Sequence, residues 1–210
     1  EALQKIQREL EELGSSLFIL HDTPLNAFET LTATYSIKNV YTNHDYEPVA
    51  IQRDAAIQQF LKTKDIPFKT YKDQVIFEKS EVTKDDGLPY SVFTPYMRKW
   101  KAKLSDFYLK AYPVNNYVSN FFKTKPFPFP SLKKIGFKSL TEMNKHFPET
   151  KIPQKKIAIY DQQRDYPAIR GTTHLGVHLR FGTVSIRQLA TVARELNETW
   201  LNELIWREFY

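Results

Sequence analysis

Apolar side chains recur at helical spacing in several parts of the chain. Near the start, Leu3, Ile6, Leu10 and Leu13 stand three or four residues apart, and Gly14 follows them. This spacing predicts an amphipathic helix that ends at the glycine. The same spacing predicts further helices over residues 24–35, 49–64, 95–112, 185–196 and 200–210.

Short apolar runs lie between the early helices and predict strands. They cover residues 16–20 and 39–42, and extended pieces follow at 68–71 and 75–77. Helix and strand therefore alternate, which is typical of a mostly parallel sheet with helical crossovers. We predict an α/β fold, a doubly wound domain over residues 1–112. Such a domain opens with a strand, whereas this sequence opens in a helix, so we expect a fragment that lacks its first strand.

Prolines interrupt the pattern after the predicted domain. They stand at positions 113, 126, 128, 130, 148 and 153, with one short helix predicted at 140–146. A connection of this length is unusual inside a compact domain, so we predict a linker over residues 113–159. Helical spacing returns after Gly171, with Ser185 as the N-cap of one helix. Residues 160–210 are therefore expected to begin an all-helical domain.

The composition narrows the class of protein. The 210 residues contain no cysteine, which excludes disulfides, cysteine-ligated zinc and thiol nucleophiles. No run of about 18 uncharged apolar residues is present, and no secretory signal opens the chain. We expect a cytoplasmic protein that does not enter the membrane.

Positive charge is concentrated in one stretch. The chain has a net charge of +6, and residues 97–139 hold ten Lys and Arg but a single acidic residue, Asp106. Aromatic residues alternate with these cations, as in surfaces that bind single-stranded nucleic acid. A solvated linker with aromatics docked on neighbouring domains explains the same composition. The stretch by itself favours the linker.

Conventional catalytic motifs are absent from the sequence. It contains no P-loop, no dinucleotide-binding glycine fingerprint, no nucleophile elbow and no zinc-protease motif. His174 and His178 are four residues apart, a spacing that zinc ligands sometimes have on a helix. Two ordinary polar residues at the start of a helix are the better interpretation, and no metal site is predicted.

Four segments in the last third carry a more specific signal. They are YDQQRDYP at 160–167, GTTHL at 171–175, LRFGTVS at 179–185 and WLNELIWREFY at 200–210. Together they resemble the DNA photolyase and cryptochrome family, and WLNELIWREFY is especially similar to class I members that repair cyclobutane pyrimidine dimers. Residues 41–48 and 92–96 are similar to the α/β antenna domain of that family.

The resemblance implies a light-driven lyase in which reduced FAD gives an electron to the dimer and recovers it after the ring splits. The family's helical domain runs well beyond residue 210, so the resemblance also implies a truncated flavin domain. A fragment of this kind is expected to be inactive and to hold FAD weakly. Its last helices, with Val192, Leu196, Leu204 and Ile205, are expected to lack partners and to drive self-association. The full-length protein is expected to be a monomer.

Site residues follow from the resemblance position by position. The positions that match the family's FAD contacts are Tyr160, Thr172, Thr173, His174, Leu175, Gly176 and Trp200. Two hydroxyls and backbone N–H groups beside a helix start suit the phosphate region of FAD. The family often has Arg and Ser where this sequence has His174 and Gly176, and the loss of that serine hydroxyl weakens the match at Gly176.

A second set of positions matches contacts to DNA. Glu203 and Trp206 match the residues that face the flipped-out dimer, and we assign them the catalytic role. They are three apart on one helix, so they are expected to share a face, and Trp206 would stack on the extruded base. Arg164 matches a contact to a DNA phosphate. Arg207 and Tyr210 are expected to contact the DNA strand.

Three questions stay open in the sequence. Folate-binding members have an Asn–Glu pair where this chain has Val49 and Ala50, so the second, antenna chromophore is unknown and folate is doubtful. A deazaflavin, another flavin or no antenna chromophore are the alternatives. A cryptochrome photoreceptor is the first alternative function, although Trp206 favours repair. A (6-4) photolyase and a plain nucleic-acid-binding module are further alternatives, and bound flavin would exclude the module.

Overall fold

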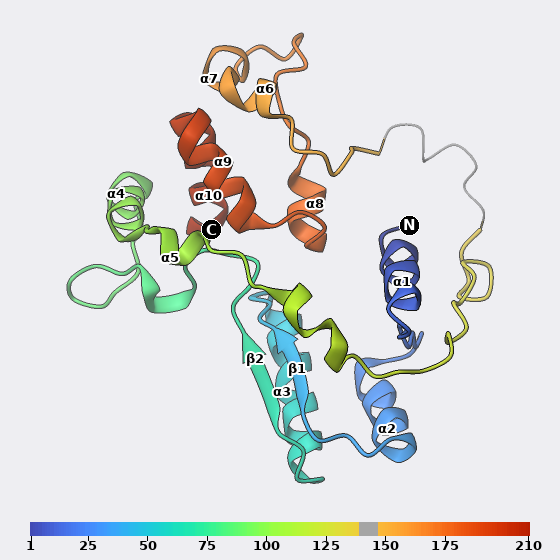
Figure 1. The fold of residues 1–210 in the computed structure, drawn as a ribbon. Helices are drawn as coiled ribbons and strands as arrows, with labels where there is room; N and C mark the ends of the chain where they lie inside the picture. Colours follow the sequence, from blue (N-terminus) through green and yellow to red (C-terminus); the bar gives the residue numbers. More distant parts are fainter. Residues whose placement is uncertain (139–146) are drawn as a thin grey trace. The chain divides into compact units, whose positions relative to one another are not determined.

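The computed structural model describes residues 1–138 and 147–210, so the short helix predicted at 140–146 lies outside the described residues. The chain forms two compact units, coloured along the sequence in Figure 1. The first, here the sheet unit, contains Glu1–Tyr71 and Tyr112–Phe147. The second, here the helical unit, contains Lys72–Ala111 and Pro148–Tyr210. Each unit thus combines two separate pieces of chain. The domain boundaries at residues 112 and 159 stay predictions.

The sheet unit contains a small parallel sheet. Strands β1 (Val40–Asn43) and β2 (Phe68–Tyr71) pair in parallel from Val40↔Phe68 to Asn43↔Tyr71. Helix α3 (Pro48–Lys62) connects them and packs on β2, as a parallel pair requires a crossover (Figure 1). Helix α2 (Pro24–Thr34) packs on α3. The predicted α/β class with a parallel sheet is confirmed.

Local sequence explains where these helices begin and end. Thr23 caps α2 by accepting the Asn26 N–H, and Pro24 occupies the first turn, where its missing N–H costs nothing. Helix α3 also starts with a proline, and it buries Ala50, Ile57 and Leu61 on one stripe. Helix α1 (Ala2–Glu12) ends before Gly14, whose φ of 72° is readily adopted by glycine.

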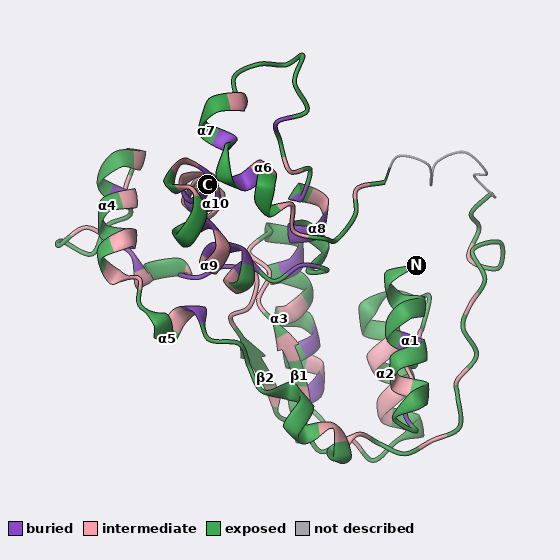
Figure 2. Cartoon of the chain, turned by 45° about the horizontal axis from the view of Figure 1, so that its top comes forward, coloured by how far each residue is buried: buried purple, intermediate pink, exposed green. Residues whose placement is uncertain are grey.

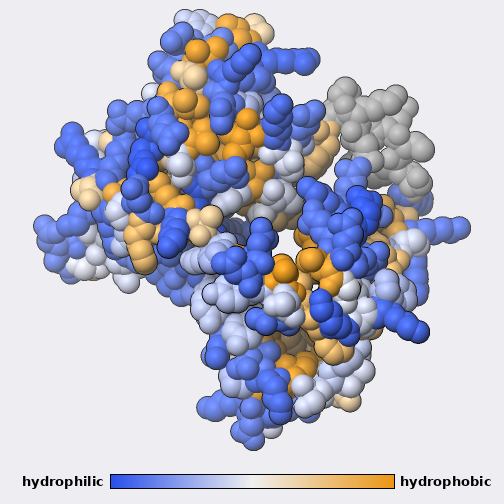
Figure 3. All heavy atoms as spheres, viewed as in Figure 1, coloured by the Kyte–Doolittle hydropathy of each residue, from blue (hydrophilic) through white to orange (hydrophobic). Residues whose placement is uncertain are grey.

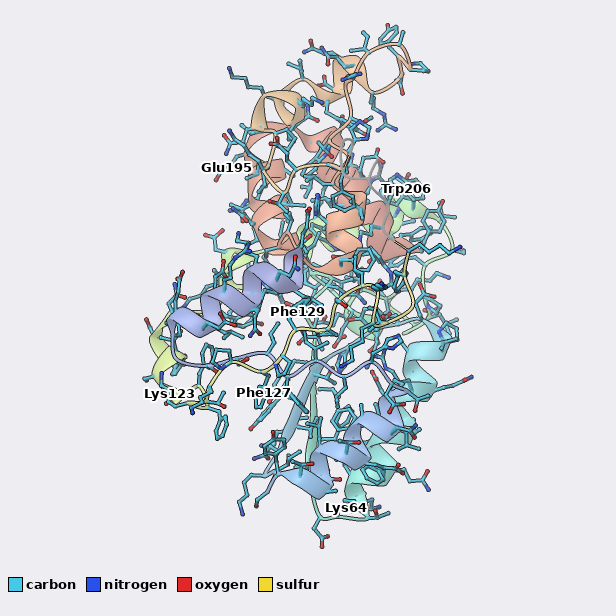
Figure 4. The ribbon with its side chains drawn as sticks, turned by 90° about the vertical axis from the view of Figure 1, so that its right-hand side faces the viewer. Lys64, Lys123, Phe127, Phe129, Glu195 and Trp206 are labelled. Atoms are coloured by element: carbon cyan, nitrogen blue, oxygen red, sulfur yellow. The ribbon has the colours of Figure 1, made fainter. Side chains whose placement is uncertain are left out.

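The strand predicted at residues 16–20 is wrong. The Leu17 N–H donates to Oε1 of Gln7 at 2.9 Å, and the Gln7 amide donates to Oγ of Ser16 at 2.9 Å. Gln7 is only 6% exposed, and its side chain takes the backbone donor that a sheet ladder would need. The ring of Phe18 packs on Phe127, which Figure 4 labels, at 4.9 Å between centroids. Side-chain contacts therefore hold this segment in place of a strand partner. A short 3-10 helix, η2 (Val114–Asn120), also belongs to this unit.

The helical unit is built from short helices packed around α9 and α10. Its elements are η1 (Lys79–Glu81), α4 (Phe93–Lys103), α5 (Asp106–Leu109), α6 (Gln154–Ala158), α7 (Tyr160–Gln163), α8 (Gly176–Phe181), α9 (Ile186–Leu196) and α10 (Glu198–Phe209). Helices α9 and α10 contact each other, and α10 also packs on α4 and α7. Figure 2 shows buried residues along both α9 and α10. The start of a helical domain predicted after residue 160 forms helices, and Ser185 stands at the N-cap position of α9 without a side-chain cap bond.

The last helices are better covered than we expected. Leu204 is 5% exposed and Ile205 is fully buried, because α4 and α9 cover that face of α10. Val192 is partly buried against the same core, and Leu196 remains 38% exposed. The expectation that these apolar faces lie bare is therefore wrong for the two α10 residues. It ignored α4, which is 90 residues or more distant in sequence.

Two further predictions needed correction. The helix predicted over residues 95–112 is split into α4 and α5, because Leu104 and Ser105 adopt extended backbone. Residues 75–77 are buried but do not join the sheet. The N–H groups of Ile76 and Phe77 donate instead to the carboxylate of Glu208 on α10, at 2.5 and 3.2 Å.

Candidate functional site

A hollow of about 250 Å³ opens in the helical unit, where three separate segments meet. Its lining consists of Tyr160, Thr172, Thr173, His174, Leu175, Gly176, Leu179, Trp200, Glu203, Leu204 and Arg207. All seven positions predicted to contact a cofactor are in this lining. The segments come from α7, from the loop that enters α8, and from α10. The fold therefore gathers residues that are up to 47 positions apart in sequence.

A close backbone contact shapes the loop that enters α8. A Cβ on Gly171 would lie 2.6 Å from Cβ of Gln163 and 3.0 Å from its carbonyl oxygen, so only glycine fits there. His174 has a φ of 55°, an uncommon conformation for a non-glycine residue. Leu175 is 2% exposed and anchors the end of the loop. These constraints leave the Thr172 and Thr173 side chains at the hollow.

Asn197 fixes the start of α10 beside the hollow. Its Oδ1 accepts the Trp200 N–H at 3.0 Å, which caps the helix. Its amide nitrogen donates to Asp161 of α7 at 2.6 Å and to the carbonyl of Ala158. One side chain thus joins α10 to α7 and sets Trp200, which is 4% exposed, against the lining.

Glu203, which lines the hollow, forms an ion pair with Arg164. Arg164 donates to Glu203, and its guanidinium lies 5.4 Å from the ring centre of Tyr160. Burial raises the pKa of Tyr160, and the negative charge of Glu203 adds to that effect. For Arg164, burial lowers the pKa, but the hydrogen bond and charge of Glu203 outweigh it and leave the pKa raised. Arg164 and Glu203, both predicted to contact DNA, are therefore brought together and fix each other's side chains.

Trp206 belongs to a different cluster from Glu203. Its ring stacks on Phe93 with 3.6 Å between centroids and 6° between planes, and on Tyr210 at 5.5 Å. Phe209 meets it edge-on at 5.6 Å. Figure 4 shows Trp206 on the α10 ribbon. Trp206 is not among the described residues that line the hollow, whereas Glu203 is. The two residues were predicted to share a helix face, but their side chains have different surroundings: Glu203 lies at the hollow and Trp206 lies among aromatic rings.

The two other predicted DNA contacts on α10, Arg207 and Tyr210, differ in their hydrogen bonds and exposure. Arg207 lines the hollow and donates to the carbonyl oxygens of Gln74 at 2.6 Å and Leu179 at 3.5 Å. Tyr210 is 95% exposed. The space-filling view in Figure 3 shows a surface on which hydrophilic residues predominate and apolar residues gather in patches. Arg207 thus connects the hollow to the backbone of Gln74.

Glu208 is a residue that the sequence analysis missed. Its carboxylate accepts from Ile76 and Phe77 N–H and from Nε1 of Trp100 at 2.6 Å. Burial raises the pKa of Glu208 although these three donors oppose that shift. Glu208 lies four residues after Leu204 and three after Ile205, on the buried stripe of α10. That spacing in the sequence could have indicated that Glu208 faces the core of the unit.

The histidine pair has an ordinary structural explanation. His178 is 3% exposed, and its ring nitrogens bond to the carbonyl of Pro148 at 2.9 Å and to Oγ1 of Thr183 at 2.8 Å. His174 precedes α8 in a left-handed conformation. Across residues 1–138 and 147–210 no group of three or more His, Asp or Glu is arranged to hold a metal. Within the same residues no helix is long and apolar enough to cross a membrane.

The chain is similar to several known proteins. A family model described as DNA photolyase matches residues 1–116. The deoxyribodipyrimidine photo-lyase of a Synechococcus strain is 30% identical over 99% of this chain and 48% of its own length. The chain therefore spans about half the length of the curated relatives it matches.

Solved structures share the fold. A bacterial class III photolyase from Agrobacterium tumefaciens superposes with a TM-score of 0.75 and 23% identity, over 99% of this chain and 47% of that one. An archaeal photolyase from Sulfolobus tokodaii, described with two FAD molecules, gives a TM-score of 0.62 and 22% identity over 99% and 45%.

Proposed function

We propose, from the premise that this chain belongs to the DNA photolyase family, that it forms part of an enzyme that repairs cyclobutane pyrimidine dimers in DNA with light and FAD. The observation that carries the proposal is the hollow of the helical unit, whose lining contains all seven positions expected to contact FAD. The chemistry of those side chains supports such a ligand.

The residues of the hollow match the parts of a flavin dinucleotide. The hydroxyls of Thr172 and Thr173 are donors for a diphosphate, and the cationic side chain of Arg207 balances its charge. Trp200 and Leu175 offer apolar surface to a ring system. The volume of about 250 Å³ lies just below the usual range of about 300–1,000 Å³ for ligand pockets, so these residues would hold one part of the dinucleotide. When bound, FAD supplies light absorption and electron transfer to the dimer.

The chain's own residues then have separate roles. Glu203, at the edge of the hollow, would donate or accept a hydrogen bond at the dimer, and Arg164 orients its carboxylate. Trp206 would stack on the extruded base, outside the hollow, and Tyr210 would touch the strand. Replacing the Arg164–Glu203 bond by contacts to DNA would release the guanidinium for a phosphate.

The finer architecture is part of the same proposal. The two described strands and α3 would belong to a doubly wound antenna domain, residues 113–159 to a linker, and residues 160–210 to the start of the FAD-binding domain. Val49 is 78% exposed and Ala50 is buried on α3, and neither side chain is acidic, so a folate is the less favoured antenna chromophore. The archaeal relative described with two FAD molecules makes a second flavin a specific candidate. Membership of class I stays a prediction.

The first test is cofactor binding by the full-length protein. We expect yellow protein with blue absorption, and weaker FAD retention in Thr172→Val and Thr173→Val because each removes one hydroxyl donor. Thr191→Val is the matched control, since the Thr191 hydroxyl bonds within α9 to the carbonyl of Arg187. Equal FAD content in all three variants would contradict the assignment of the hollow.

The second test is repair. Under blue light the reduced full-length protein should restore DNA that contains a cyclobutane dimer, and Glu203→Ala should slow repair. Glu195→Ala, an exposed glutamate on α9 labelled in Figure 4, is the matched control. Bound flavin without repair of this lesion would favour a cryptochrome or a (6-4) photolyase, and no bound flavin would favour a nucleic-acid-binding module.

A further inference from the structure

Phe93 lies directly over the ring of Trp206. The centroids are 3.6 Å apart and the planes differ by 6°, so one face of the indole is covered by a parallel ring. At this separation the two rings are in van der Waals contact. Phe209 meets both rings edge-on, at 5.6 Å from Trp206 and 5.9 Å from Phe93. Phe93 therefore fixes the plane of the indole, and Phe209 keeps the indole from rotating within that plane.

Helix α4 holds Phe93 rigidly in this position. Phe93, Tyr96 and Trp100 stand at positions i, i+3 and i+7, so they share one face of α4. Tyr96 packs on Phe209 at 5.3 Å, and Nε1 of Trp100 donates to Glu208 at 2.6 Å. Tyr96 and Trp100 are 8% and 1% exposed. Three successive contacts thus lock this face of α4 to α10, and Phe93 is the outermost of them.

We infer that Phe93 is a positioning residue for dimer recognition, a backing ring that fixes the indole plane of Trp206 so that an extruded base stacks on the indole in place of the Tyr210 ring, which lies 5.5 Å from it in this structure. The inference rests on the proposed function. A planar ring is required because a non-planar side chain of similar size fills the volume but does not hold the indole parallel. A stacking platform gains affinity when its orientation is fixed before the ligand arrives.

The test compares planar and non-planar side chains at position 93 in the full-length protein. Equilibrium binding is measured with one oligonucleotide that contains a single thymine dimer and with the same undamaged sequence. Phe93→Leu should weaken binding of the dimer DNA by about two- to tenfold, the worth of one aromatic pair, and leave undamaged DNA unchanged. Phe93→Tyr should restore dimer binding to within about twofold of the parent.

Controls separate this role from packing. Tyr90→Leu makes the same kind of change three residues earlier, at a ring that meets Tyr96 edge-on at 6.1 Å, and should leave the dimer preference unchanged. Phe93→Met provides a second non-planar variant, and the melting temperature of each variant establishes that it is folded. The inference is overturned if Phe93→Leu and Phe93→Met keep the parent's preference, or if Phe93→Tyr loses as much as they do.

Trp206→Ala distinguishes this inference from the proposed function. If Trp206→Ala weakens dimer DNA selectively but Phe93→Leu does not, the backing role of Phe93 is wrong and the proposed site stands. If Trp206→Ala weakens both DNAs equally, the stacking role of Trp206 is wrong, and the inference falls with it.

Discussion

Replacing Glu208 with alanine removes the acceptor that three N–H groups share. The donors are the backbone of Ile76 at 2.5 Å and of Phe77 at 3.2 Å, and Nε1 of Trp100 at 2.6 Å. All three residues are at most 3% exposed, so water does not reach the donors in the parent. The substitution therefore leaves three buried donors without an acceptor and separates residues 76–77, α4 and α10.

The magnitude follows from those donors. An unsatisfied buried donor costs about 1–3 kcal/mol, so three cost about 3 kcal/mol at the low end of that range. The low end applies because the alanine variant also avoids the cost of burying a carboxylate. For a chain of about 150–250 residues, this loss corresponds to a melting temperature lower by about 6–12 °C.

Denaturant unfolding of the 210-residue chain, followed by circular dichroism, measures this loss. Glu198→Ala is the matched control on the same helix, because Glu198 is an exposed partner of Lys101 and its removal should change stability by at most about 0.5 kcal/mol. If Glu208→Ala loses no more than the control, the carboxylate does not hold these three segments together, and the reasoning from donors to stability is wrong.

Three further outcomes are expected. Because burial raises the pKa of Glu208, the folded chain keeps a proton that the unfolded chain has released above the usual range of a glutamate. Stability should therefore fall as pH rises from that range through the raised pKa, and Glu208→Gln should abolish this slope in pH-dependent unfolding. Gly171→Ala should displace the loop before α8, since its Cβ would lie 2.6 Å from Cβ of Gln163, and FAD titration of the full-length protein should show weaker binding. Asn197→Ala should cost about 1–2 kcal/mol in thermal unfolding by removing the cap on Trp200 N–H, and an unchanged melting temperature would contradict it.

Helical spacing predicted most of the helices because each buries a stripe of its own side chains. The stripe of Ala50, Ile57 and Leu61 on α3 was readable in the sequence and is buried in the structure. The same holds for Leu189 and Ala193 on α9. A period of 3.6 residues is a local property, so it needs no knowledge of the partner.

Short apolar runs predicted strands less reliably than helical spacing predicted helices. Residues 39–42 and 16–20 were both predicted to be strands, yet only the first overlaps a strand, Val40–Asn43. A strand exists only when another strand accepts its backbone hydrogen bonds, and for Leu17 the side chain of Gln7 took that place. The difference lies in a contact ten residues away, which no pattern within the run records.

For the candidate site too, some features were predictable from the sequence and others depended on packing. The family's motifs in the sequence pointed to nine of the eleven residues that line the hollow, among them Tyr160 and Trp200, but not to Leu179 and Leu204. Only the tertiary structure decided how the charges and rings are used. It paired Arg164 with Glu203, laid Phe93 over Trp206 and bonded Glu208 to the backbone of residues 76–77. These contacts join positions 39, 113 and more than 130 residues apart, and their geometry depends on how α4, α7 and α10 pack, which local chemistry does not specify.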